Sequence, residues 1–278
     1  MRSGMAFLFM LTLFTSCMDH YELGEKYFEE ENYEKAEFHF EKASKIDRGN
    51  WKILYTLARS KEEVGKYDQA IDLYSQSLTI NKTVAGHLGR ARCYQQDDYY
   101  LEGAIIDYSE AIRLRRKGNF DAFYGRGRVY MKDGNYYKAL ADINQAIKIR
   151  PEHINAYYHR AIIRSQIRDN RGALSDMNYV IRKREDFRQA HFNRGIIYQR
   201  LGAFAKAVND FNVAMRLGTH HGDIYVRRGK SFLELGNTVK ACKDFKVAEK
   251  LSSRLQGKLL KNIVRKNRIF QNGTSGEI

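Results

Sequence analysis

The chain has 278 residues, a formal net charge of +15, 43% hydrophobic residues and a single proline. The apolar content supports a folded core and argues against a disordered chain. Proline averages about 5% of residues in proteins, so a single proline favours helices joined by short turns over an all-β or α/β fold. Three cysteines are too few for a disulfide framework.

Residues 1–16 combine one positive charge, a short apolar run and small residues before Cys17. Ten mostly apolar residues would extend about 15 Å as a helix, half of the ~30 Å hydrocarbon core, which argues against a permanent membrane span. The segment resembles a bacterial lipoprotein signal peptide, although Phe14 stands where that family usually has leucine. The resemblance implies cleavage before Cys17 and lipid attachment to its thiol. It also implies a cell-envelope location, with the outer membrane favoured because Met18 rather than aspartate follows the cysteine. Ordinary secretion and an uncleaved anchor are the alternatives.

An alanine recurs every 34 or 35 residues through most of the chain. A large apolar residue follows it by four positions and a mostly small residue by seven, which places all three on one face of a helix. Turn signals such as Val64-Gly65-Lys66-Tyr67 divide each unit into two helices. The recurring alanines are Ala36, Ala70, Ala104, Ala139, Ala173, Ala207 and Ala241.

These positions resemble the tetratricopeptide repeat, whose pattern is filled in the first copy by Gly24, Tyr27, Ala36, Phe40 and Ala43. The resemblance implies an all-α, right-handed α-solenoid of about seven helix-turn-helix repeats that stack into one array. One extra residue before Ala104 predicts a longer turn in the third repeat. Residues 254–270 are predicted to form a basic capping helix, or alternatively a helix on a membrane surface, and residues 271–278 a disordered tail. The expected repeats are 17–50, 51–83, 84–119, 120–153, 154–187, 188–221 and 222–253.

Arginine and aspartate recur in register in repeats three to seven. One position before the small residue of the first helix, these repeats carry arginine, where the first two repeats carry Leu23 and Leu57. Three positions after the recurring alanine they carry aspartate, where the first two repeats carry His39 and Leu73. Both positions change residue type at the third repeat. We therefore predict that the arginine and the aspartate of one repeat form an ion pair between its two helices, for which the planar arginine fork is suited. The predicted pairs are Arg90 with Asp107, Arg126 with Asp142, Arg160 with Asp176, Arg194 with Asp210, and Arg228 with Asp244.

The remaining face of each first helix is predicted to line the concave side, where tetratricopeptide repeats commonly bind extended or helical peptides. Tyrosine and arginine are enriched at interface hot spots, although a tyrosine here can equally serve repeat packing. Tyr124 and Arg128 stand where the family's chaperone-binding members have lysine and asparagine, which disfavours a heat-shock co-chaperone role. The predicted groove residues are Tyr55, Arg59, Arg92, Tyr124, Arg128, Tyr158, Ile162, Phe192, Ile196, Arg200 and Lys230.

No phosphate-binding glycine loop, HExxH, GxSxG or CxxC motif occurs, and the histidines are scattered, so no enzyme activity, cofactor or metal site is predicted. The net charge runs from −5 over residues 17–50 to +5 over residues 254–278. We therefore predict a non-enzymatic, lipid-anchored scaffold for a protein or peptide partner, with an acidic partner expected at the basic end. The alternatives are binding of nucleic acid, which the export signal disfavours, binding of another anionic polymer, and a role as a substrate-binding subunit of an envelope enzyme complex.

Overall fold

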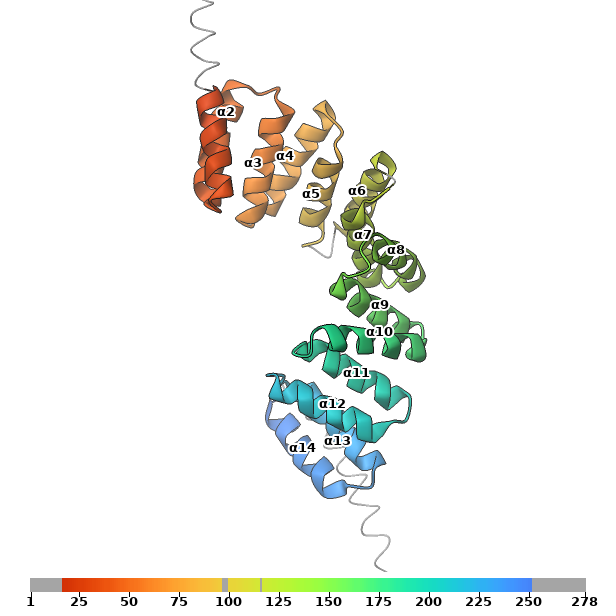
Figure 1. Cartoon of the computed structure of the whole chain (residues 1–278). Coiled ribbons are helices and arrows are strands. Elements are labelled where there is room, and N and C mark those ends of the chain that lie inside the picture. Colours follow the sequence, from red (N-terminus) through yellow and green to blue (C-terminus); the bar gives the residue numbers. More distant parts are fainter. Residues whose placement is uncertain (1–16, 97–99, 116, 252–278) are drawn as a thin grey trace, which may run out of the picture. The chain divides into compact units, whose positions relative to one another are not determined.

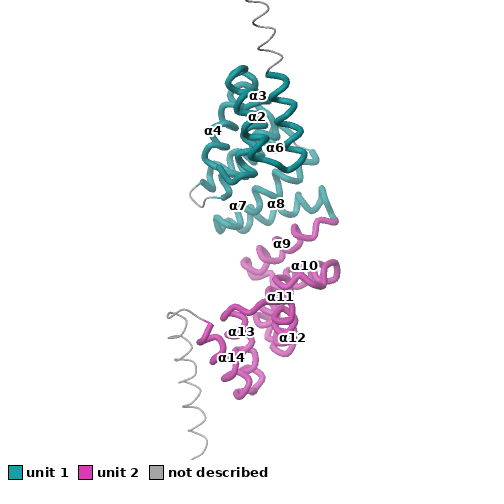
Figure 2. Tube along the Cα trace, turned by 90° about the vertical axis from the view of Figure 1, so that its left-hand side faces the viewer, with its two compact units in different colours: residues 1–151 teal, residues 152–278 magenta. Residues whose placement is uncertain are grey.

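The computed structural model describes residues 17–96, 100–115 and 117–251, and all of its regular elements there are helices (Figure 1). The expected signal peptide, capping helix and tail lie outside the described residues. The chain divides into two compact units, one ending at Pro151 and the other beginning at Glu152 (Figure 2). Each unit is described by itself below.

The first unit contains a helix over residues 17–29 followed by seven further helices. They are α2 (Tyr33–Ile46), α3 (Trp51–Glu63), α4 (Tyr67–Ile80), α5 (Val84–Tyr94), α6 (Leu101–Leu114), α7 (Phe120–Lys132) and α8 (Tyr136–Ile149). Helices α3 and α4, α5 and α6, and α7 and α8 pack as pairs, and each pair packs on the next.

The second unit repeats this arrangement with six helices. They are α9 (Ile154–Gln166), α10 (Asn170–Lys183), α11 (Arg188–Arg200), α12 (Phe204–Arg216), α13 (Gly222–Glu234) and α14 (Thr238–Leu251). The first helices of successive repeats, α9, α11 and α13, also contact one another.

The recurring alanines explain the close approach of the paired helices. All seven are completely buried, and the large residues four positions later, such as Phe40, Met177 and Phe211, are buried beside them. The facing small residue is needed for the same contact, because a Cβ on Gly195 would lie 2.7 Å from the ring of Phe211. Burying a small residue under a large one in each repeat yields a continuous core without a sheet.

Short turns end the first helix of most repeats in the same way. Gly65 has a φ of +78°, which a residue without a Cβ adopts at no steric cost, and the Lys66 amide donates to the Lys61 carbonyl. Arg168 takes the equivalent position in the fifth repeat with a φ of +64°. In the third repeat, residues 95–100 connect α5 to α6. The sequence predicted a longer connection in this repeat than in the others.

Candidate functional site

The arginines and aspartates that recur in repeats three to seven form bidentate ion pairs between the two helices of their own repeat. In each pair the arginine Nε and Nη2 donate to the two carboxylate oxygens at 2.6–2.9 Å, and the aspartate side chains are at most 8% exposed. This geometry gives the strongest form of charge-assisted hydrogen bond. The arginines are thereby committed to holding each repeat together.

The electrostatics are clearest at Asp107, which accepts hydrogen bonds from Arg90 and from the Nδ1 of His87. Burial by itself raises the pKa of the Asp107 carboxyl, but the bonds from Arg90 and His87 outweigh it and hold the pKa below its ordinary value. The bonds to Asp107 raise the pKa of Arg90, although burial acts in the opposite direction. Both groups are therefore held in their charged forms.

A third contact, not predicted from the sequence, joins these arginines to the preceding repeat. The Nη1 of Arg90 donates to the Ser75 hydroxyl at 2.9 Å, and Arg194 donates in the same way to the Asn178 amide oxygen at 2.9 Å. Arg126 and Arg228 repeat the contact with Ser109 and Asn212. Four of the five charged pairs thus also fix their repeat to the preceding one.

The first two repeats use a different network. Lys61 donates to Glu37 at 2.6 Å and to Glu41 at 2.9 Å, and Lys66 donates to both oxygens of Glu37. Burial raises the pKa of Glu37, but the hydrogen bonds from the two lysines outweigh it and lower the pKa overall. The first two repeats are therefore joined to each other by lysine–glutamate pairs, whereas the arginine–aspartate pairs of the later repeats lie within one repeat.

In the first unit, the groove predicted along the first helices is filled by its own side chains. Tyr74 packs over Gly89, and its hydroxyl donates to Glu62 at 2.6 Å. Arg92 binds the same carboxylate through two bonds, Nε to Oε1 at 2.6 Å and Nη2 to Oε2 at 3.0 Å. The charge of Arg92, predicted to serve a ligand, is therefore neutralised within the chain.

The other predicted residues of this unit also have partners within the chain. Arg59 lies over the ring of Phe28, 4.3 Å from its centroid, and near Tyr55. Arg128 lies over Tyr124, whose ring stacks on Phe120.

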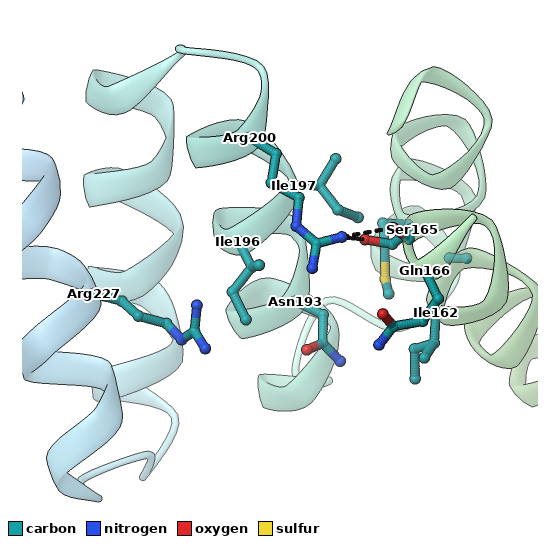
Figure 3. Close-up of a pocket in the computed structure, with 10 residues that line it drawn as sticks. Ile162, Ser165, Gln166, Asn193, Ile196, Ile197, Arg200 and Arg227 are labelled. Atoms are coloured by element: carbon teal, nitrogen blue, oxygen red, sulfur yellow. Dashed lines mark hydrogen bonds between the residues drawn. The ribbon is translucent and has the colours of Figure 1, made fainter. Parts of the chain in front are cut away.

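The second unit carries a pocket of about 190 Å³ between α9, α11 and α13 (Figure 3). Three predicted groove residues, Ile162, Ile196 and Arg200, line it. Its other lining residues are Ala161, Ser165, Gln166, Met177, Asn193, Ile197 and Arg227.

The pocket is lined by apolar, neutral polar and cationic side chains. Figure 3 shows Ile162 and Ile196 from neighbouring helices beside the guanidinium groups of Arg200 and Arg227. The Nη1 of Arg200 donates to the backbone carbonyl and hydroxyl of Ser165, both at 2.6 Å, and these partners are neutral. No aspartate or glutamate lines the pocket, so the positive charge of Arg200 is not balanced there.

Two substitutions between equivalent repeat positions explain why the pocket is open here. Met177 is the equivalent of Tyr74, and Asn193 is the equivalent of Gly89. The tyrosine ring that lies over Gly89 in the first unit is thus replaced by an unbranched thioether, and Met177 and Asn193 both line the pocket. Ser165 also replaces Glu62, so the carboxylate that neutralises Arg92 has no counterpart.

The remaining predicted groove residues of this unit surround the pocket without lining it. The Tyr158 hydroxyl accepts a hydrogen bond from Asn193 at 2.8 Å, which positions that amide at the pocket. Phe192 packs against Phe211 and His221, and Lys230 is exposed on α13. Sequence reasoning missed Asn193 and Arg227, which lie two positions before the small residue of their helices.

Cys17, the predicted lipid attachment site, is the first described residue and is 6% exposed. Its Sγ lies 3.7 Å from the Ala43 carbonyl oxygen, which it approaches as a donor, and it packs against Ile53. Burial, followed by the charge of Asp47, raises the pKa of the thiol. In the folded first repeat this sulfur therefore faces the core.

Within the described ranges, no cluster of three or more histidine, cysteine, aspartate or glutamate side chains is arranged to hold a metal ion. Across the same residues, no helix has both the length and the hydropathy of a membrane span.

Comparison with known proteins places the chain in a family. Models of the tetratricopeptide repeat match residues 27–96, 120–153 and 158–220, which together exceed half of the chain. Human (Homo sapiens) sperm-associated antigen 1 is 37% identical over 91 residues, which cover 32% of this chain and 10% of that protein. The chain thus matches only about a tenth of the length of this relative.

Solved structures show the same fold at low sequence identity. A tetratricopeptide repeat protein from Parabacteroides merdae ATCC 43184 is 21% identical with a TM-score of 0.65, covering 90% of this chain and 98% of its own. Pseudomonas aeruginosa pilF is 13% identical with a TM-score of 0.65, covering 80% and 98%. MamA from Desulfovibrio magneticus RS-1 is 19% identical with a TM-score of 0.55, covering 65% and 94%. The chain therefore belongs to the tetratricopeptide repeat family.

Proposed function

We propose that this protein is a non-enzymatic scaffold that binds a segment of a partner protein in the pocket between α9, α11 and α13. The observation that carries the proposal is the contrast between the two units. In the first unit Tyr74 lies over Gly89 and Glu62 neutralises Arg92, whereas in the second unit Met177 and Ser165 stand at the positions of Tyr74 and Glu62 and line an open pocket beside Arg200. A recess with an apolar wall and a few placed polar groups is the usual form of a recognition site.

The partner is expected to be acidic where it meets the second unit. The pocket contributes two arginines and no carboxylate, and exposed Lys230 follows on α13. Complementary charge accelerates encounter and selects partners more than it adds affinity. Binding should therefore weaken as the ionic strength rises.

Lipid anchoring through Cys17 at the cell envelope is part of the same proposal, supported by the resemblance of residues 1–17 to a lipoprotein signal. Because the Cys17 sulfur is buried against Ala43 and Ile53 in the folded repeat, acylation has to precede packing of the first helix. Metabolic labelling with a fatty acid should mark the wild-type protein and not Cys17→Ala. Labelling that persists in Cys17→Ala contradicts the anchoring proposal and leaves the pocket proposal intact.

The pocket is tested by photocrosslinking in the native cell. A crosslinking amino acid replaces Gln166, which lines the pocket, or Tyr137, which is 76% exposed in the first unit and serves as the control. A double variant, Met177→Tyr with Asn193→Gly, copies the closed arrangement of Tyr74 and Gly89 into the pocket. We expect one adduct from position 166 that disappears in the closed variant and persists in Met177→Leu. An adduct that is unaffected by closure contradicts the proposal.

A further inference from the structure

We propose that the pocket recognises a linear segment in which one carboxylate side chain adjoins a bulky apolar side chain. This inference rests on the proposed function and narrows its ligand. It follows from the size of the pocket, the presence of both isoleucine and arginine side chains in its lining, and its charge.

The apolar wall sets the size of the side chain that enters. Ile162 on α9 and Ile196 on α11 are partly exposed at the pocket, and the buried side chains of Ile197 and Met177 lie beneath them among its lining residues. An engineered apolar cavity of about 150 Å³ accepts benzene, so a pocket of about 190 Å³ has room for a side chain the size of leucine or phenylalanine. The isoleucines present no flat ring on which a nucleobase could stack, in contrast to the platforms that bind single-stranded nucleic acid.

The cationic wall sets the charge of the neighbouring group. Arg227 is paired through its Nε with Asp223 at 2.7 Å, on its own helix. Arg200 donates only to neutral oxygen atoms of Ser165 among its described partners. One arginine charge is therefore balanced and the other is not, which suits a singly charged carboxylate better than a doubly charged phosphate.

The arginine geometry favours a carboxylate held beside the apolar group. Arg200 uses one of its terminal nitrogens for Ser165, and the remaining N–H groups of its planar fork are available for a bidentate acceptor. The bonds to Ser165 also hold the guanidinium at the pocket, which reduces the ordering cost of binding. Asn193, positioned by the Tyr158 hydroxyl, adds an amide for the backbone of an extended segment.

The test is selection of a phage-displayed library of random peptides, about twelve residues long, on the protein from residue 17 to 278. We expect enrichment of peptides with aspartate or glutamate next to a leucine, isoleucine or aromatic residue. An enriched peptide, synthesised with a fluorophore, should lose at least about tenfold in affinity to Arg200→Gln and to the closed variant Met177→Tyr/Asn193→Gly. Arg216→Gln makes the same charge change at an exposed site on α12 and should bind as the wild type does.

The outcomes separate this inference from the proposed function. Enriched peptides that lack an acidic residue but are lost on closure contradict the carboxylate inference and retain the pocket as a binding site. Peptides that bind equally to the closed variant, or a selection that enriches none, contradict both. Circular dichroism of each variant establishes that loss of binding does not reflect loss of fold.

Discussion

Replacing Asp176 with alanine should destabilise the second unit more than any single exposed substitution. Asp176 is 3% exposed and accepts three arginine hydrogen bonds, two from Arg160 at 2.9 and 2.7 Å and one from Arg164 at 2.8 Å. The alanine variant leaves both guanidinium groups without this carboxylate. Burial of the two arginines is substantial, since their side chains are 16% and 24% exposed.

The expected magnitude follows from this geometry. Removing one partner of a buried ion pair costs about 3–5 kcal/mol, because the other charge remains desolvated. Arg160 and Arg164 retain some access to water, so we expect about 3 kcal/mol, the lower end of that range. Asp176→Asn keeps the shape of the side chain and one acceptor oxygen, and should cost less.

Urea unfolding followed by far-ultraviolet circular dichroism measures the change, and amide hydrogen exchange of α9 and α10 locates it. Asp186→Ala in the same unit is the matched control, since Asp186 is exposed and lies in a turn. Equal losses of unfolding free energy in Asp176→Ala and Asp186→Ala would refute the structural role of the pair. A loss that is confined to α13 and α14 would also contradict it, because Asp176 has no bond to either helix.

Three further outcomes are expected. Hydrogen bonds from its partners lower the pKa of Asp107 in the folded protein. Its contribution to the free energy of unfolding is therefore complete above the unfolded-state pKa of about 3.9 and is lost as the pH falls through the lower folded-state pKa. Asp107→Asn should flatten this acid dependence in urea titrations from pH 7 to pH 3. Gly89→Ala should destabilise the first unit by about 1–3 kcal/mol, since its Cβ overlaps the Tyr74 ring, and Tyr74→Met should restore part of the loss in thermal unfolding. Burial raises the pKa of the Cys93 thiol to about 12, so a maleimide at neutral pH should label the half-buried Cys242 and reach Cys93 only after denaturation.

Each of these outcomes has a contrary result. Trp51 fluorescence reports unfolding of the first unit selectively. An acid dependence of its stability that is unchanged in Asp107→Asn would show that the Asp107 carboxylate does not cause that dependence. A Gly89→Ala variant as stable as the wild type would mean that the Tyr74 ring moves without cost. Labelling of Cys93 at the rate of Cys242 in the native protein would contradict its burial.

The fold followed from the sequence because its determinants are local and periodic. Alanines at a constant interval, with large residues four positions later, specify the paired helices directly. Arginine and aspartate both first occur at their positions in the third repeat, which indicates a contact within one repeat. Serine or asparagine occupies the position of Ser75 and Asn178 in repeats two to six, whereas the first repeat carries Glu41. This run begins one repeat before the arginines, the offset that a contact with the following repeat requires.

The site was only partly predictable. The repeat register placed Ile162, Ile196 and Arg200 on the concave face of the first helices, but every repeat has such a face. Whether the face is open depends on how far the side chain at the position of Tyr74 or Met177 reaches across from the preceding repeat. That length matters only once the helices are packed, so periodicity alone treats both residues as equivalent core positions.

The ion pairs have a consequence for how an array of this kind changes in length. In repeats three to seven each of these arginines finds its opposite charge inside its own repeat, and the bonds that Arg90, Arg126, Arg194 and Arg228 make to the preceding repeat end on an uncharged serine or asparagine. Deleting or duplicating one of repeats four to seven therefore leaves none of these buried arginines or aspartates without its counterion. The first three repeats differ, because Glu37 with Lys61 and Glu62 with Arg92 form ion pairs across repeat boundaries, and loss of one of those repeats would leave a charge unpaired.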